Sequence, residues 1–280
     1  MIPRRHLSTL SNRLGEAGGH RIPESILERD YCIAWFLVGL SINPFREHLV
    51  FKGGTALKRC YFGDYRFSED LDFTLVEEVP FAEILNELNR VFADVRRRSG
   101  VVLRYSREDR YDHANTYAFY LGYEGPLPGG GKEIKVDITI RELIVSAPVF
   151  RRVLRFYEEY ADLPENAEIK VYTLDEIATE KIMAVTDAAR NEPRDLYDLW
   201  FLTEGHHVDL TDLRDGLDRK LASKGRRLQG LGDALMRKEG RLRREWDRRL
   251  SGQINRLPLF DEVFRATRRS LRQAGLFGEC

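Results

Sequence analysis

The segment KGGTALKRCYFGDYRFSEDLDFTL, Lys52 to Leu75, holds two glycines, an Arg-x-Ser and an Asp-x-Asp within one short stretch. The apolar run HLVF, typical of a strand, leads into Gly53 and Gly54, and the TALKRCYF that follows is helix-like. Adjacent glycines allow a tight turn and let a phosphate approach the backbone amides, because no Cβ stands in the way. A helix beginning near Thr55 would add free N–H groups, the positive end of a dipole and a hydroxyl donor. Taken alone, a Gly-Gly pair favours a plain tight turn.

The Asp-x-Asp lies in EDLDFTLVE, where apolar and polar residues alternate as in a strand. Alternate side chains of a strand share one face, about 6.6 Å apart, so Asp70 and Asp72 project two carboxylates together. Such carboxylates repel each other unless a cation lies between them, and Mg²⁺ prefers carboxylate oxygens together with substrate phosphates. An exposed edge strand with acidic residues would show the same pattern.

A third carboxylate, Asp137, lies on the expected strand KEIKVDITIREL, on the face opposite an Ile/Val stripe. Two-metal phosphoryl transfer uses two carboxylates that hold a metal, a third carboxylate beside them and a phosphate-binding turn nearby. Asp70, Asp72, Asp137 and the Gly-Gly turn would supply these groups. The sequence leaves open whether the strand of Asp137 lies beside that of Asp72.

Lys181 lies at the centre of an apolar helical stripe in TLDEIATEKIMAVTDAA. Thr173 and Glu176 have the spacing of a capping box at the start of this helix. A lysine on a buried face costs free energy unless it is paired or bound to a ligand, and a triphosphate would be such a ligand. A lysine that extends its ammonium group to solvent is the ordinary alternative.

The next helix, EPRDLYDLWFL, has Pro193 in its first turn and carries Asp195 and Asp198 on one face. A carboxylate in the first turn is stabilised by the helix dipole, which is a sufficient structural role for Asp195. An ion pair between Lys181 and Asp195 on two adjacent helices is a third interpretation.

The order of expected elements predicts an α+β fold, with a mixed β-sheet flanked by helices and a mainly helical C-terminal region. Residues 1–150 are expected to form an α/β catalytic domain. Residues 151–280 are expected to form a mainly helical domain that completes the site with Lys181 and Asp195 and has a basic end. Outside the opening segment, helices are expected over residues 22–42, 81–95, 173–189 and 192–202, and strands over residues 101–106, 116–124 and 132–143.

The composition is that of a globular protein, with 42% hydrophobic and 32% charged residues. The most apolar run, Tyr31 to Leu40, is about half of the ~20 residues that a membrane span needs. The chain opens without the apolar segment of a secretory signal. Three scattered cysteines are too few for a disulfide framework or a zinc site. We therefore expect a cytoplasmic protein that does not bind a membrane.

The net charge of zero conceals an asymmetry between two parts of the chain. Residues 211–280 hold 18 Lys and Arg against 10 Asp and Glu, a net charge of +8, so residues 1–210 carry −8. This asymmetry suggests a polyanionic partner for the basic part. A solvated face of long helices is the simpler explanation of the charge run.

Four ordered motifs resemble those of the AbiEii/MenT family, nucleotidyltransferase-like toxins of bacterial toxin–antitoxin and phage-defence systems. This family lies within the DNA polymerase β nucleotidyltransferase superfamily. The motifs are Lys52–Leu57, Arg66–Phe73, Glu180–Lys181 and Arg194–Leu199. The resemblance spans about residues 45–202 and is more specific than any single motif. It implies a nucleotidyltransferase-like sheet for the N-terminal part.

The resemblance assigns a role to residues of each motif. It implies that Asp70 and Asp72 bind Mg²⁺ or Mn²⁺ and that Lys181 contacts the triphosphate, with Asp195 as a further catalytic residue. It implies nucleotide binding by Lys52, Gly53, Gly54, Thr55, Arg66, Ser68 and Asp198. Asp137 lies outside the family motifs, so its role rests on the strand argument alone. The interval between Gly54 and Asp70 is slightly longer than is usual in the superfamily.

The activity implied by the resemblance is transfer of NMP from an NTP to the 3′ end of tRNA, which would block translation. A cognate antitoxin is the second implied partner, and DNA is not expected as a partner. A small-molecule, antibiotic-type nucleotidyltransferase and a non-catalytic nucleotide- or partner-binding module are the alternatives. An Asp-x-Asp glycosyltransferase fits less well, because the Gly-Gly unit precedes the acids. The sequence leaves the NTP, the RNA acceptor and the means of silencing open.

Overall fold

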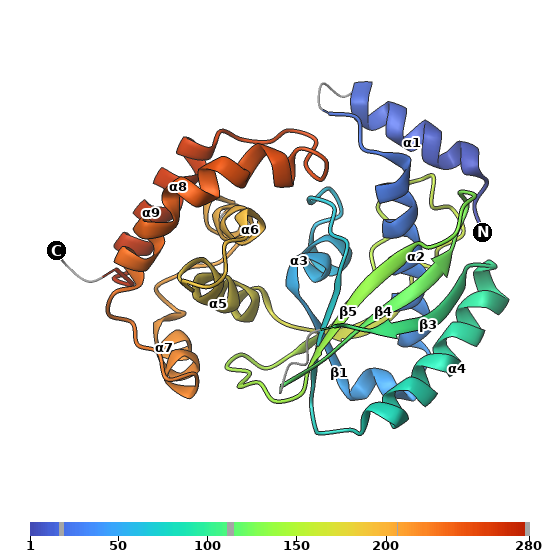
Figure 1. Cartoon of the computed structure of the whole chain (residues 1–280), viewed down its shortest axis with the longest axis horizontal. Helices are drawn as coiled ribbons and strands as arrows, with labels where there is room; N and C mark the ends of the chain where they lie inside the picture. Colours follow the sequence, from blue (N-terminus) through green and yellow to red (C-terminus); the bar gives the residue numbers. More distant parts are fainter. Residues whose placement is uncertain (17–19, 111–114, 206, 278–280) are drawn as a thin grey trace. The chain divides into compact units, whose positions relative to one another are not determined.

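The computed structural model describes residues 1–16, 20–110, 115–205 and 207–277, which form two compact units (Figure 1). The first unit comprises Met1–Glu142, Pro148–Val171 and Gln253–Asn255, and the second comprises Leu143–Ala147, Tyr172–Gly252 and Arg256–Cys280. The main division therefore lies near residue 172 and not near residue 150. The expected helical pattern from Phe150 onward begins later, because two short strands, at 149–152 and 168–171, join the sheet.

The fold is α+β, as the sequence predicts. The helices of the first unit are α1 (Arg4–Glu16), α2 (Glu24–Ser41), α3 (Gly53–Ala56), which continues as a π-helical turn (Leu57–Tyr61), and α4 (Phe81–Ser99), with a 3₁₀ turn at Pro44–Glu47. Its strands are β1 (Leu49–Lys52), β2 (Leu71–Leu75), β3 (Val102–Glu108), β4 (Thr116–Glu124), β5 (Glu133–Thr139), β6 (Val149–Arg152) and β7 (Glu168–Val171).

The strands of the described residues form one seven-stranded mixed sheet in the order β3-β4-β5-β2-β1-β7-β6. Strands β2 and β5 run parallel, as do β1 and β7, whereas the remaining neighbours are antiparallel. The central position of β1 and β2 places the two ends of the opening segment in the middle of the sheet.

Helix α2 packs on the apolar face of the central strands. The Phe36 ring lies 6.3 Å from that of Phe73, which in turn lies 5.1 Å from Phe51. Helix α4 packs against α2 where Gly39 leaves room for Val95: a Cβ at Gly39 would lie 2.5 Å from the Val95 side chain. Because strand side chains alternate, the residues beside Phe51 and Phe73 in sequence face the opposite side of the sheet.

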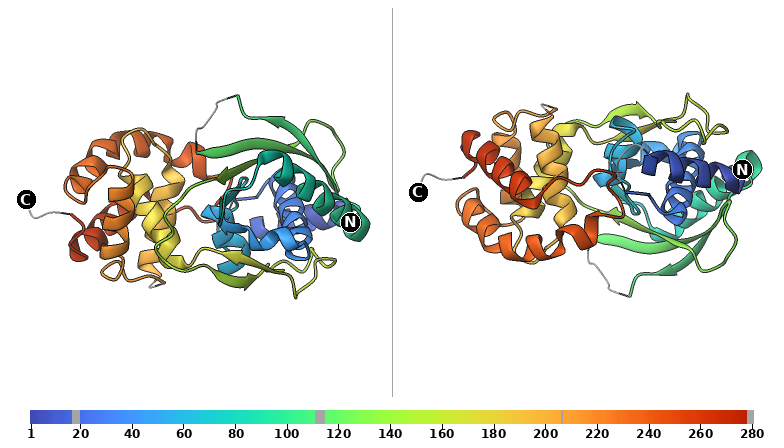
Figure 2. Two further views of the ribbon diagram at one scale, coloured as in Figure 1. Left: turned by 90° about the horizontal axis from the view of Figure 1, so that it is seen from below. Right: turned by 90° about the horizontal axis from the view of Figure 1, so that it is seen from above.

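The second unit consists of helices α5 (Leu174–Val185), α6 (Pro193–Glu204), α7 (Arg214–Ser223), α8 (Leu231–Leu250) and α9 (Phe260–Gln273) (Figure 2). Half of the expected capping box forms, since the Thr173 hydroxyl accepts a bond from the Glu176 N–H at 3.2 Å. Helix α6 packs against α5, α8 and α9 and buries Leu196, Leu199 and Leu202.

Two of the three cysteines, Cys32 and Cys60, lie in the described residues, and both are buried free thiols. Burial raises the pKa of both thiols. None of the helices described combines the length and the apolar character that a membrane crossing requires.

Candidate active site

The glycine turn begins α3 directly after β1, two residues before the expected helix start. Gly53 has φ +76°, in the left-handed region that favours glycine. A Cβ at Gly53 would lie 2.5 Å from Oδ2 of Asp72. Glycine is therefore required here for the backbone conformation and for the close approach of a carboxylate.

The second glycine, Gly54, lies against two polar side chains of the Arg-x-Ser motif. A Cβ at Gly54 would lie 2.3 Å from Nη2 of Arg66 and 3.3 Å from Oγ of Ser68. Both side chains are buried. The Thr55 hydroxyl donates to the main-chain carbonyl of Asp70 at 2.5 Å. This hydrogen bond ties the glycine turn to the Asp70 main chain, so the hydroxyl proton is not directed at a ligand. The turn thus brings the first two motifs together.

A row of charged residues crosses the sheet on the face opposite Phe51 and Phe73. Lys52 on β1 is the register partner of Asp72 on β2, and Asp72 is the register partner of Asp137 on β5. Residues directly opposite each other on paired strands project from the same face of the sheet. The structure therefore places Asp137 beside Asp72, which the sequence left open.

Asp137 has a lysine partner on its own strand. Nζ of Lys135 lies 3.0 Å from Oδ2 of Asp137 and 3.4 Å from Oδ2 of Asp109. Burial lowers the pKa of Lys135, but the two carboxylates outweigh it and raise the pKa overall. This lysine keeps a positive charge next to the carboxylates of the row.

The oxygen donors at the turn fit a hard divalent cation. Mg²⁺ is usually held by one or two carboxylates and completes its shell with waters and substrate phosphates. Asp72 places a carboxylate oxygen on the glycine turn, and Asp70 lies two residues before it with its main chain bound to Thr55. In the part of the chain that is described, no group of three or more His, Cys, Asp and Glu side chains could hold a metal ion.

The second unit holds a buried cluster of ionic groups between α5 and α6. Nζ of Lys181 lies 2.7 Å from Oδ1 of Asp195 and 2.7 Å from Oδ2 of Asp198. Nε of Arg190 lies 2.5 Å from Oδ2 of Asp195. Of these residues only Arg190 is largely exposed. The ion pair considered from the sequence is present, with Asp198 as a second acceptor.

The cluster keeps Asp195 ionised. Burial by itself would raise the pKa of Asp195, but Lys181 and Arg190 outweigh it and lower the pKa to about 2. The two carboxylates also account for the burial of Lys181, so burial alone does not indicate a ligand for it. Lys181, Asp195 and Asp198 belong to the second unit, whereas the glycine turn and the charged row belong to the first.

Two residues at the first site were not anticipated from the sequence. Lys58 is buried and donates to the carbonyls of Gly63 and Tyr65, both at 2.9 Å, in the segment that precedes Arg66. Gln253 follows α8 and contacts the segment around Arg66. Lys58 lies within the opening segment, and its place on an apolar helix face was the available signal. No pattern marks Gln253.

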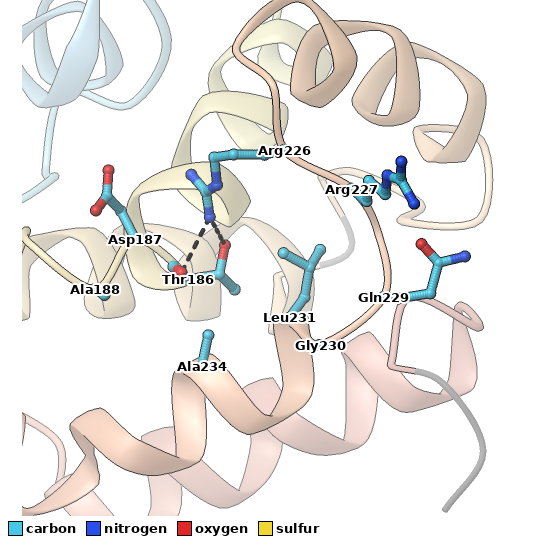
Figure 3. A pocket seen from close by; sticks show the side chains of 9 residues that line it. All are labelled: Thr186, Asp187, Ala188, Arg226, Arg227, Gln229, Gly230, Leu231 and Ala234. Atoms are coloured by element: carbon cyan, nitrogen blue, oxygen red, sulfur yellow. Dashed lines mark hydrogen bonds between the residues drawn. The ribbon is translucent and has the colours of Figure 1, made fainter.

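A cavity of about 380 Å³ lies in the second unit (Figure 3). Its walls come from the segments after α5 and before α8 and from the start of α8. Figure 3 shows Arg226 directed at Thr186, whose carbonyl and hydroxyl oxygens it contacts at 3.0 and 3.1 Å. Arg226 thereby supplies hydrogen bonds to carbonyl groups at the C-terminal end of α5. None of the residues predicted from the sequence lines this cavity.

Comparisons with known proteins bear on the fold and the family. The chain is 20% identical to JHP933 from Helicobacter pylori, with a TM-score of 0.59 over 90% of this chain and 93% of that chain. It is 17% identical to MenT4, the nucleotidyltransferase toxin Rv2826c from Mycobacterium tuberculosis H37Rv, with a TM-score of 0.61 over 98% and 90% of the two chains. These likenesses show a shared fold.

A search of curated proteins gives no significant match. The family described as nucleotidyl transferase AbiEii toxin, of a type IV toxin–antitoxin system, matches residues 35–266. This range covers most of the chain and includes every residue of the four motifs, from Lys52 to Leu199. The family named from the four motifs is therefore confirmed: the chain belongs to the AbiEii family and is a nucleotidyltransferase.

Proposed function

We propose that this protein is a metal-dependent toxin that transfers NMP from an NTP to the 3′ end of tRNA in the cytoplasm and so blocks translation. Family membership supplies the reaction class. The observation that supports the metal and nucleotide sites is the packing at the glycine turn. There the Asp72 side chain packs against Gly53, and the Arg66 and Ser68 side chains pack against Gly54. Anion-binding groups and a metal-binding carboxylate thus meet at adjacent residues.

The triphosphate would bind at the glycine turn. The Gly53 and Gly54 amides can be approached closely, and a guanidinium forms strong charge-assisted bonds to phosphate oxygens. Arg66 and Ser68 are therefore assigned to the nucleotide phosphates. Lys52, whose strand position is opposite Asp72, adds a positive charge in the same row. We assign Lys181 to the triphosphate from its family motif, with Asp195 and Asp198 holding its ammonium group.

Asp70 and Asp72 would hold Mg²⁺ or Mn²⁺, which neutralises phosphate charge as it develops in the transition state. The acceptor hydroxyl oxygen attacks the α-phosphorus of the NTP, and pyrophosphate leaves with the electron pair of the broken P–O bond. The hydroxyl proton passes to a carboxylate. Asp137 is the proposed acceptor of this proton, because it is the register partner of Asp72.

The tRNA acceptor would be held by cationic groups of residues 211–280. Arg237, Arg241 and Arg244 are exposed on α8 at spacings of four and three residues, which places them on one helix face. In the described residues none of the three forms an ion pair or hydrogen bond. We call these three residues the arginine stripe. Unpaired arginines on one face suit the phosphate backbone of RNA.

Transfer of label from an α-³²P-labelled NTP to tRNA tests the proposal. The wild-type protein should label the 3′ end of tRNA in the presence of Mg²⁺, and Asp70→Ala should abolish labelling. An Asp70→Ala protein that labels tRNA at the wild-type rate would refute the mechanism. A panel of small hydroxyl acceptors in the same assay separates the antibiotic-type alternative, which predicts labelled small molecules and unlabelled RNA.

The antitoxin expected from the type IV family is a further part of the proposal. Co-expression with the product of a neighbouring gene should restore growth if the protein is toxic. Growth arrest by the wild-type protein and normal growth with Asp70→Ala would tie toxicity to nucleotidyl transfer. Equal arrest by both proteins would contradict this link.

A further inference from the structure

Residues 253–255 follow α8, yet they belong to the first unit, while the residues on either side of them belong to the second. We call residues 253–255 the strap. Gln253 and Ile254 are buried. The strap meets the first unit at two places, one at the segment between Arg66 and Glu69 and the other near α1.

Gln253 makes three contacts with the segment between Arg66 and Glu69. Its carbonyl accepts from the N–H of Phe67 at 2.9 Å. Its side-chain oxygen accepts from Nη1 of Arg66 at 3.4 Å, and its side-chain nitrogen donates to Oε1 of Glu69 at 3.1 Å. One residue thus binds the main chain and both flanking charged side chains of the segment that leads into Ser68 and Asp70.

The Arg66 guanidinium has a fixed place as a result. Nη1 is shared between the Phe67 carbonyl at 3.2 Å and Gln253, while Nη2 lies on Gly54. A free arginine side chain samples many rotamers, and ordering it opposes binding. The amide oxygen of Gln253 orders the guanidinium without cancelling its charge, which a carboxylate would do. The bond to Gln253 therefore adds no negative charge beside the guanidinium.

We propose that Gln253 is a positioning residue for the nucleotide, which holds the Arg66 guanidinium at the glycine turn so that it meets the NTP phosphates. This inference rests on the proposed function, because it takes the glycine turn to be the phosphate site. Gln253 acts through Arg66 and does not itself touch the nucleotide. It lies outside all four family motifs.

Gln253→Met tests this role, because it removes both side-chain bonds at similar volume and leaves the carbonyl bond to Phe67. We expect the Kd of the NTP, measured by calorimetry with Mg²⁺, to rise about tenfold, as for the loss of one bond to a charged group. KM for the NTP should rise in parallel, whereas kcat should change little. Gln253→Glu should also raise the Kd, because its carboxylate neutralises Arg66 and repels Glu69.

Asn255→Met is the matched control. Asn255 is part of the same strap and its side chain donates to the Leu14 carbonyl at 3.2 Å, away from the glycine turn. Asn255→Met should lower the melting temperature, as Gln253→Met does, but should leave the Kd of the NTP unchanged. Equal Kd values for the two variants would overturn the inference. If Gln253→Met does not fold, Gln253→Glu against Asn255→Asp makes the same comparison.

The Arg66→Met background distinguishes positioning from a general structural role. If Gln253 acts through Arg66, Gln253→Met should have no further effect on the Kd in that background. The same tenfold effect in both backgrounds would overturn the inference while the proposed function stands. Wild-type protein that binds no NTP would overturn the proposed function and this inference together.

Discussion

Asp72 and Asp137 are register partners on the adjacent parallel strands β2 and β5, although they lie far apart in the sequence. Their carboxylates project from the same face of the sheet, while the other face packs against α2. Asp72 also packs against the glycine turn, where its carboxylate lies next to Gly53. Asp72 therefore has Asp137 and Gly53 as neighbours in the fold, although both are distant from it in the sequence. Asp137 has Lys135 as a counter-charge, and Lys135 also binds Asp109.

Asp137→Asn should therefore lower kcat for nucleotidyl transfer by about 10²- to 10⁴-fold, the usual contribution of a general base. The Kd of the NTP should change little, because the substitution preserves shape and lies outside the phosphate site. Asp109→Asn is the control, since it weakens the same Lys135 pairing without altering Asp137. A loss of kcat as large in Asp109→Asn would mean that the charge of Lys135, and not proton transfer by Asp137, is responsible.

Gly53→Ala should abolish transfer and lower the free energy of unfolding by more than the about 1–3 kcal/mol of an unfavourable φ alone. The added Cβ would lie 2.5 Å from the Asp72 carboxylate, so that carboxylate has to move. Gly131→Ala is a matched control, because Gly131 has φ +74° and nothing within 4 Å of the new Cβ. Urea unfolding and labelling assays on both variants separate the two effects. Equal losses would show that the Asp72 contact is unimportant.

The ionic cluster of the second unit predicts an acid-sensitive contribution to stability. The pKa of Asp195 is lowered from 3.8 to about 2, so the folded state prefers the ionised form. Its contribution of about 2 kcal/mol is present above pH 4 and is lost as the pH falls through 2. The difference in unfolding free energy between wild type and Asp195→Asn should shrink over that range. A difference that does not change with pH would contradict the assignment.

The same cluster affects how an activity loss at Lys181 is interpreted. Lys181→Met should lower the free energy of unfolding by about 3–5 kcal/mol, because it leaves the buried Asp198 without this partner. Lys181→Met, Asp198→Leu removes both charges and should recover much of that loss. If transfer stays abolished in the double variant at recovered stability, the role of Lys181 goes beyond folding. Recovered transfer would show a structural role only.

How much of the fold and the site the sequence predicts depends on how far apart in the chain the interacting residues lie. β2 and α4 were predicted because their apolar periods are local properties, and the Lys181–Asp195 pair was foreseen because both lie on apolar helix faces. The strands β6 and β7 were missed, since each has four residues and β6 is exposed along its length. The neighbours Asp72 and Asp137 depend on long-range strand pairing, which no local pattern encodes.

Lys58 predicts a change in stability at alkaline pH. Burial lowers its pKa from 10.5 to about 7, so above pH 7 the folded state loses a proton that the unfolded state keeps. Stability relative to Lys58→Met should therefore rise between pH 7 and about 10.5, by at most about 1.4 kcal/mol per pH unit. Chemical denaturation at several pH values measures the difference, and Lys238, whose pKa is also lowered, is present in both proteins and cancels. A flat difference would contradict the prediction.

The arginine stripe predicts a salt dependence of tRNA binding. Each phosphate contact that is lost lowers the slope of log K against log salt by roughly 0.7–0.9. Arg237→Gln, Arg241→Gln, Arg244→Gln should therefore reduce the slope by about 2 to 3 and raise KM for tRNA. The Kd of the NTP should not change, because the stripe is assigned to RNA alone. Fluorescence anisotropy with labelled tRNA over a range of salt concentrations measures the slope.

The same helix supplies the control for the stripe. Arg243, Arg248 and Arg249 lie on α8 but are paired with acidic side chains. Their triple substitution by Gln changes the net charge by the same amount, so general attraction between protein and RNA falls equally in both variants. Only the stripe variant should lose phosphate contacts. If both triple variants reduce the slope equally, the effect belongs to net charge and α8 is not the RNA-binding face.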